Sequence, residues 1–101
     1  MSAYIIVYRE TPVTDEEAIQ EYSRRNRENA ASSQSDFGTQ PVVVYGKAEA
    51  LEGAAPDGVV VLRFPTVEAA RSWYDSKEYQ EAIPFRQKAA DWRVVLVEGI
   101  G

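Results

Sequence analysis

The sequence predicts an α+β fold in which two helices cover one face of a four-stranded antiparallel sheet. Four short segments are rich in β-branched and aromatic residues, which favour strands. Two longer segments carry helix-start signals and apolar residues at helical spacing. These elements follow one another in the order β-α-β-β-α-β, which is the ferredoxin-like order.

The N-terminal part of the chain predicts one strand and one helix. Residues 3–8 are mostly β-branched or aromatic and are expected to form the strand. Thr14 and Glu17 have the spacing of a capping box, so a helix should begin there and run to about Ala31. Residues 32–40 are polar and contain a glycine, which is typical of a loop.

The predicted first helix has an inner and an outer face. Tyr22 marks the inner face, which should pack on the sheet. On the outer face, Glu21 lies four residues before Arg25, and Arg24 lies four residues before Glu28. Opposite charges at this spacing are neighbours on a helix, so we expect two ion pairs at the surface.

The middle of the chain predicts two strands joined by a long connection. Residues 42–45 and 59–64 are the strands, and residues 46–58 contain the glycines and proline of a hairpin connection. Pro65 then ends the third strand, and Thr66 is the expected N-cap of the second helix.

The C-terminal part predicts the end of the second helical region and the last strand. The helix should end near Asp75, after which Ser76 restarts a short helical turn. Pro84 is expected to open or kink a final helix because proline lacks the N–H that a helix interior needs. Residues 93–98 form the fourth strand.

Three of the strands are apolar on both faces, as the runs at residues 42–44, 59–62 and 94–97 show. An antiparallel sheet with one wet face should instead alternate apolar and polar residues. Because two helices can cover only one face, we expect the other face to be buried against an identical subunit. A stable interface of standard size buries roughly 800 Å² per partner, which a whole sheet face can supply. A face covered by a ligand or left partly exposed is the alternative.

Composition limits the chemistry of the protein. The 101 residues are expected to form a single domain, residues 1–101. The absence of Cys and His excludes thiol nucleophiles and a His-ligated haem, and it removes the commonest general base and metal ligand. The net charge of −5 argues against a nucleic-acid partner, and no apolar run approaches membrane length. We therefore expect a soluble, cytoplasmic protein with no cofactor and no metal.

Several motifs of the C-terminal half resemble a known bacterial family. They are Leu51-Glu52-Gly53, residues 60–74, Ser76, Glu78-Tyr79-Gln80, Ala82, Arg86, Ala89-Ala90 and Val97-Glu98-Gly99. With these motifs the chain resembles the domain-of-unknown-function 1330 family, within the dimeric α+β barrel superfamily. The resemblance implies a homodimer in which two sheets form a barrel with the helices outside. It implies no established activity, although the wider superfamily includes cofactor-free monooxygenases, haem-degrading enzymes and lactone isomerases.

Arg86 is the first candidate for a ligand-binding residue. Its neighbours one helical turn away include no carboxylate, in contrast to Arg71 and Lys77. An arginine in such a position can anchor an anionic ligand, since guanidinium binds carboxylate in a bidentate manner. The alternative, which we favour from sequence, is a structural ion pair with a carboxylate such as Glu98.

Four other residues are candidates for the lining of a pocket. Arg63 and Glu98 interrupt or end apolar strands, so they either reach solvent or the dimer seam at the strand ends or form a polar cluster at a cavity mouth. Tyr22 and Tyr74 face inward at helical spacing, where they either pack in the core or direct a hydroxyl into a pocket.

Two functions remain open on this reading. The first is a homodimeric binding or structural module without catalysis, which fits the absence of a recognisable nucleophile–base pair. The second is a cofactor-independent enzyme, resembling a monooxygenase or an isomerase, that acts on a small anionic or aromatic molecule. In that enzyme, Arg86 would orient the substrate, and a tyrosine or carboxylate would transfer the proton.

Overall fold

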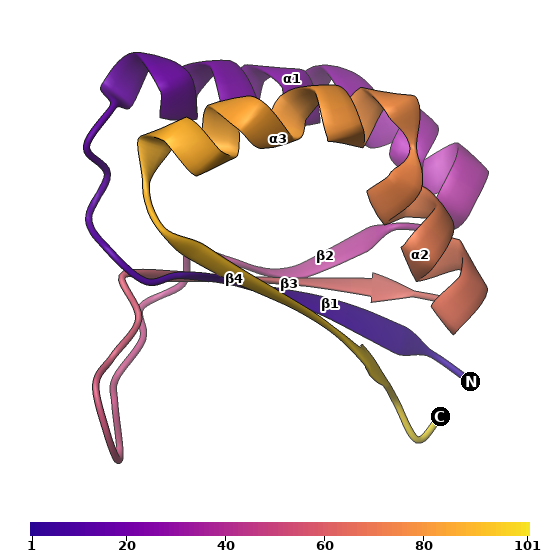
Figure 1. Cartoon of the computed structure of the whole chain (residues 1–101). Coiled ribbons are helices and arrows are strands. Elements are labelled where there is room, and N and C mark those ends of the chain that lie inside the picture. The colour runs from indigo at the N-terminus through magenta and orange to yellow at the C-terminus, as the bar shows by residue number, and fades with distance from the viewer.

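A computed structural model describes all 101 residues, and it has an antiparallel four-stranded sheet in the order β2-β3-β1-β4. The elements are β1 (Ala3–Arg9), α1 (Glu16–Phe37), β2 (Gln40–Val44), β3 (Gly58–Phe64), α2 (Val67–Asp75), α3 (Lys77–Ala89) and β4 (Trp92–Glu98). All three helices lie on one side of the sheet, with α1 and α3 running side by side (Figure 1). The predicted ferredoxin-like α+β fold is therefore confirmed.

The core lies between the sheet and the helices. Ala3, Ile5 and Val7 of the central strand β1 are almost fully buried, because alternate residues of a strand point to the same face. Phe64, at the end of β3, is 1% exposed and stacks 5.6 Å from the ring of Trp73 on α2. Trp73 in turn lies 4.1 Å from the ring of Tyr79 on α3, so aromatic contacts join all three layers of the core.

The second helical region consists of two helices, so the expected restart at Ser76 is confirmed, although α3 is a full helix and not a short turn, which gives three helices in place of two. Ser76 separates them, because its Oγ accepts a hydrogen bond from the N–H of Tyr79 and donates one to the carbonyl of Trp73. The expectation that Pro84 opens a final helix is wrong, since α3 begins at Lys77 and continues through Pro84. Ile83 and Arg86 are buried on either side of Pro84, and this packing holds the helix across the missing hydrogen bond.

The first helix is longer than the sequence predicts. Residues 32–37 continue α1, and the strand β2 begins directly at Gln40, so the expected loop at residues 32–40 is wrong. Gly38 ends the helix with a φ of 68°, a conformation that glycine adopts without steric cost. Phe37 packs against the hydrophobic core, and this tertiary contact stabilises the serine-rich last turns.

The start of α1 also differs from the prediction. Asp15 is the N-cap, and its Oδ1 accepts a hydrogen bond from the N–H of Ala18 at 3.0 Å. Thr14, the predicted cap, instead donates from its hydroxyl to the carbonyl of Ala89 at 3.3 Å. This bond ties the entrance of α1 to the end of α3.

The sheet face away from the helices is apolar and uncovered. We call it the outer face and define it by Tyr4, Ile6, Tyr8, Val43, Val59, Val61, Val95 and Val97, which the strand register places on that side. Val95 and Val97 are 37% and 43% exposed, respectively. Strands that are apolar on both faces, as the sequence predicts, thus leave one apolar face in contact with solvent in the single chain.

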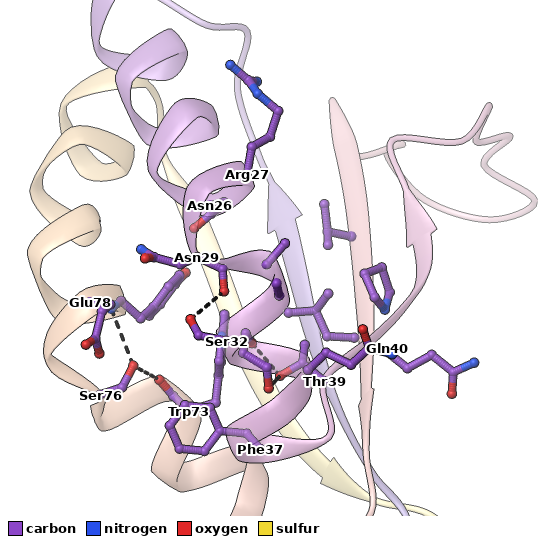
Figure 2. A pocket seen from close by; sticks show the side chains of 18 of the residues that line it. Asn26, Arg27, Asn29, Ser32, Phe37, Thr39, Gln40, Trp73, Ser76 and Glu78 are labelled. Atoms are coloured by element: carbon purple, nitrogen blue, oxygen red, sulfur yellow. Dashed lines mark hydrogen bonds between the residues drawn. The ribbon is translucent and has the colours of Figure 1, made fainter.

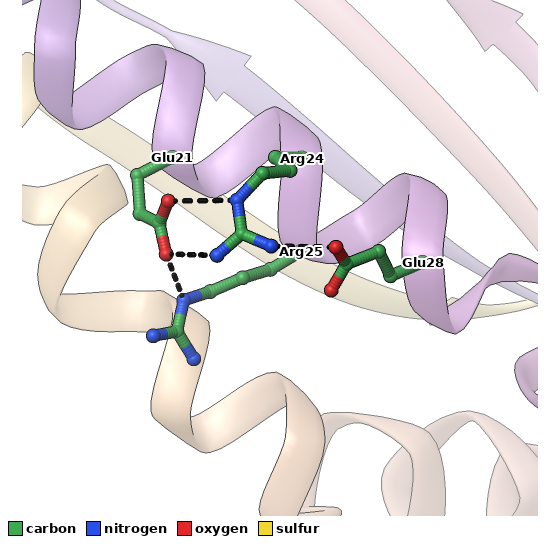
Figure 3. Close-up of polar contacts among 4 residues, drawn as sticks. All are labelled: Glu21, Arg24, Arg25 and Glu28. Carbon is green, nitrogen blue, oxygen red and sulfur yellow. Dashed lines mark hydrogen bonds and ion pairs between the residues drawn. The ribbon is translucent and has the colours of Figure 1, made fainter.

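The surface of α1 carries the ion pairs expected from the sequence. Glu21 accepts hydrogen bonds from both Arg24 and Arg25, and Arg24 also pairs with Glu28 (Figure 3). The hydrogen bonds from Arg24 and Arg25 lower the pKa of Glu21 from 4.5 to about 2. None of the helices is both long and apolar enough to span a membrane.

Because of the ion pairs of Glu21, the difference in stability between the wild-type protein and Glu21→Gln should depend on pH. At neutral pH, Glu21→Gln should lower the urea midpoint slightly, because surface pairs stabilise weakly. The folded state holds the pKa of Glu21 at about 2, below its ordinary value of 4.5. The stabilisation is therefore complete above pH 4.5 and is lost as the pH falls toward 2. Urea titrations at pH 7 and pH 2.5 should show the two proteins converging at the lower pH, and an equal gap at both values would contradict this account.

Candidate functional site

A cavity of about 690 Å³ lies between α1 and the sheet. Its walls are apolar and come from every layer of the fold, namely Val7, Phe37, Val44, Val60, Leu62 and Trp73. Polar residues of the second half of α1 and of the segment after it also line the cavity, among them Asn26, Asn29, Ser32 and Thr39 (Figure 2). Eleven of the 24 lining residues are hydrophobic, so the site combines an apolar surface with many polar groups, and its volume suits a small-molecule ligand.

Three tyrosines belong to the lining of this cavity. Tyr22 of α1 and Tyr79 of α3 are buried, and their hydroxyl oxygens are 2.9 Å apart. Burial raises the pKa of Tyr79 above its usual range; the neighbouring Tyr22 adds to the effect and the positive charge of Arg86 opposes it. The Tyr79 hydroxyl is therefore protonated at neutral pH, and because one hydroxyl of the pair donates to the other, one O–H is left to donate to a ligand.

Tyr45, directly after β2, is the third tyrosine of the lining. Its φ is 54°, which is unusual for a bulky residue and costs conformational energy. A Cβ atom at Gly58 would lie only 2.7 Å from the ring of Tyr45, so the glycine makes room for this ring. Burial raises the pKa of Tyr45, Tyr22 adds to that effect, and Arg9 and Arg86 oppose it.

Arg86 is buried without a countercharge. Arg86 is 4% exposed, and its Nε has no hydrogen-bond partner. The guanidinium lies 5.7 Å from the centre of the Trp92 ring, whose Nε1 donates to the carbonyl of Arg86 at 2.7 Å. The ion pair with Glu98 that we favoured from sequence is wrong, because Glu98 is exposed at the end of β4 and the structure pairs Arg86 with no carboxylate.

The structure separates the five residues that the sequence suggested for a pocket. Tyr22 lines the cavity. Arg86 does not line it, but its guanidinium lies near the ring of Trp92, which packs on Tyr22, and its charge acts on Tyr79. Tyr74 packs 5.6 Å from the ring of Tyr79 but does not line the cavity.

The two remaining candidates lie at the strand ends. Arg63 is exposed on the outer-face side of β3 and donates to the hydroxyl of Ser2 at 2.9 Å. Glu98 is exposed at the last position of β4. Neither side chain lines the cavity. Ligand binding by any of the five residues stays a prediction.

Sequence reasoning missed three residues of this region. Tyr79 was not among the candidate residues, although it lines the cavity. Arg9 and Tyr45 lie at strand ends, and the guanidinium of Arg9 is 5.2 Å from the Tyr45 ring. The only sequence signal for Tyr45 is its place before Gly46 at the start of the hairpin connection, which does not indicate where its ring points.

The fold and the cavity place the protein among small ferredoxin-like α+β proteins. A protein of unknown function from Rhodopseudomonas palustris has a TM-score of 0.69 at 17% identity, over 99% of this chain and 83% of its own. A dimeric ferredoxin-like protein of unknown function from Jannaschia sp. CCS1 has a TM-score of 0.69 at 11% identity, over 98% and 100%. A candidate antibiotic biosynthesis monooxygenase from Nitrosomonas europaea has a TM-score of 0.64 at 15% identity, over 98% and 90%. At these identities the likeness shows the fold alone.

The chain belongs to the family described as domain of unknown function DUF1330, whose model matches residues 2–100. No curated protein matches the chain.

Proposed function

We propose that this protein is a homodimeric binding module that takes a small molecule into the cavity between α1 and the sheet. The observation that carries the proposal is the cavity itself, about 690 Å³ in volume, with apolar walls and three tyrosines in its lining. The apolar walls favour a ligand with an aromatic or aliphatic body, and the hydroxyls orient it through hydrogen bonds.

Binding accounts for this geometry better than catalysis does. A proton-transfer enzyme needs a base whose pKa lies near the working pH. Burial instead raises the pKa of Tyr79, so this phenol remains a hydrogen-bond donor at neutral pH. The carboxylates of the lining, Asp36 and Glu78, belong to exposed residues, so they are in contact with water rather than shielded from it.

The homodimer is supported by the outer face. Val43, Val95 and Val97 on this face are exposed and its other apolar or aromatic residues are half-buried, so a second copy of the same face would bury them in a two-fold interface. Similar structures from Jannaschia sp. CCS1 and Thermobifida fusca are described as dimeric. The hairpin connection between β2 and β3 extends beyond the sheet on this side, and its Leu51 is 87% exposed (Figure 1). The connection would therefore reach toward the partner.

Nuclear magnetic resonance can test the cavity directly. Titration of the ¹⁵N-labelled protein with a neutral aromatic probe, benzyl alcohol, should shift the amide signals of Val7, Leu62 and Trp73, which line the cavity. The variant Val60→Phe should abolish the shifts, because the larger side chain fills the space. Its control is Val95→Phe, which makes the same change on the outer face and should leave the probe's binding intact. Shifts confined to the outer face would contradict the cavity as the binding site.

A further inference from the structure

We infer that the ligand carries a carboxylate, which the tyrosines of the cavity and two arginines behind them, the half-buried Arg9 and the buried Arg86, recognise. This inference rests on the proposed function and names the ligand class: a small aromatic or aliphatic monocarboxylate. Arg9, Tyr22, Tyr45, Tyr79 and Arg86 carry the argument, and we call them the inner cluster.

The two arginines of the inner cluster differ from the other cations of the chain. Arg24, Arg25, Lys88 and Arg93 have carboxylate partners. The remaining cations without an ion pair are Arg27, Lys47, Arg63, Arg71 and Lys77, and all of them are exposed to water. Arg9 and Arg86 alone combine burial of the Nε atom with the absence of any partner for it.

The inner cluster is one electrostatic unit. The guanidinium of Arg9 lies 5.2 Å from the centre of the Tyr45 ring and donates to the carbonyl of Asp57 at 3.2 Å. Both Arg9 and Arg86 act on the titration of Tyr45, and Arg86 also acts on Tyr79. No ion pair joins a carboxylate to either arginine. The cluster therefore has two positive charges and three phenols but no negative charge.

This charge balance determines which ligand group fits. Withdrawing a guanidinium from water is costly unless a countercharge and hydrogen bonds compensate. Tyr22 and Tyr79 both line the cavity, so a carboxylate at this pair would accept a hydrogen bond from the O–H that is not used in the bond between the two tyrosines. The positive potential of the arginines would strengthen this bond, since hydrogen bonds to an ionised acceptor are stronger than neutral ones. The rest of the ligand would lie against Val60, Leu62 and Trp73.

A matched pair of probes separates the effect of the ligand's charge on affinity from the effect of its shape. Benzoate and benzamide have nearly the same size, but only benzoate is ionised at pH 7. Isothermal titration calorimetry with the wild-type protein should show benzoate binding about tenfold or more tighter than benzamide, as expected for charge-assisted hydrogen bonds. Equal affinities would overturn the inference and leave the proposed cavity site standing. Failure of both probes and of benzyl alcohol to bind at millimolar concentration would overturn the inference and the proposed function together.

Variants of the two arginines then test whether the inner cluster causes the preference for benzoate over benzamide. Arg86→Gln should lower benzoate affinity by about tenfold and leave benzamide affinity within about twofold. Arg71→Gln is the control, because Arg71 is an exposed arginine on α2 that does not line the cavity, and it should change neither affinity. Arg9→Gln provides a second variant if Arg86→Gln does not fold, and it should also reduce the preference for benzoate. Unchanged benzoate affinity in the folded variants would overturn the role of the arginines.

Discussion

The Val61→Lys variant is expected to be a monomer at concentrations where the wild-type protein is a dimer. Val61 lies at the centre of the outer face, paired with Ile6 on β1 and with Val43 on β2. In the monomer a lysine at this position can extend into water, so the fold should persist. In a two-fold interface the lysine occurs twice and would be buried without a partner, which costs several kcal/mol. The dissociation constant should therefore rise by at least about 100-fold.

Analytical ultracentrifugation at micromolar protein concentration measures this effect. The control is Val44→Lys, which introduces the same charge on the neighbouring strand but on the side of the helices, where it should leave the dimer intact. A wild-type protein that sediments as a monomer would refute the homodimer. A Val61→Lys protein that remains dimeric would show that the interface lies elsewhere on the molecule.

Replacement of Phe64 by alanine should cause the largest loss of stability. Phe64 is 1% exposed and lies between the sheet and the ring of Trp73, which itself packs on Tyr79. Removing a buried phenylalanine costs about 3–5 kcal/mol, because the transfer free energy is lost and a void remains. A domain of this size has a total stability of roughly 5–15 kcal/mol, so the variant should be close to unfolding.

Urea denaturation at equal protein concentrations should measure the loss, since the stability of a dimer depends on concentration. Gln87→Ala is the control, because Gln87 is exposed on α3, on the side away from the outer face, and its truncation should change the unfolding free energy by at most about 0.5 kcal/mol. A loss below about 1 kcal/mol for Phe64→Ala would contradict the assigned core. It would also weaken the account of the cavity, whose wall includes Trp73.

Local sequence was sufficient to predict the strands, because their residue types determine both the preference for a strand and which sides of the sheet are apolar. The valine runs at residues 42–44, 59–62 and 94–97 predicted the three strands and an apolar second face, and the structure has that face open. The helix boundaries depended on tertiary contacts and were predicted less well. Phe37 stabilises the serine-rich end of α1 by packing on the core, and no pattern within residues 32–40 indicates that contact.

For the candidate site, the sequence indicated one key residue but not its surroundings. Arg86 was recognisable because its helical neighbours include no carboxylate, whereas the partner we expected, Glu98, is far from it at a strand end. Tyr45 and Arg9 enter the site through the geometry of the hairpin connection, where Tyr45 has a positive φ. Such geometry depends on how Gly58 and Tyr45 fit together in three dimensions, which residue types alone do not reveal.

A crystal structure of the protein grown with millimolar benzoate tests the central claim most directly. We predict density for benzoate in the cavity, with its ring against Leu62 and Trp73 and its carboxylate within hydrogen-bond distance of Tyr22 or Tyr79. Benzoate absent from a cavity that ordered water fills, or a cavity closed by movement of α1 onto the sheet, would contradict the account.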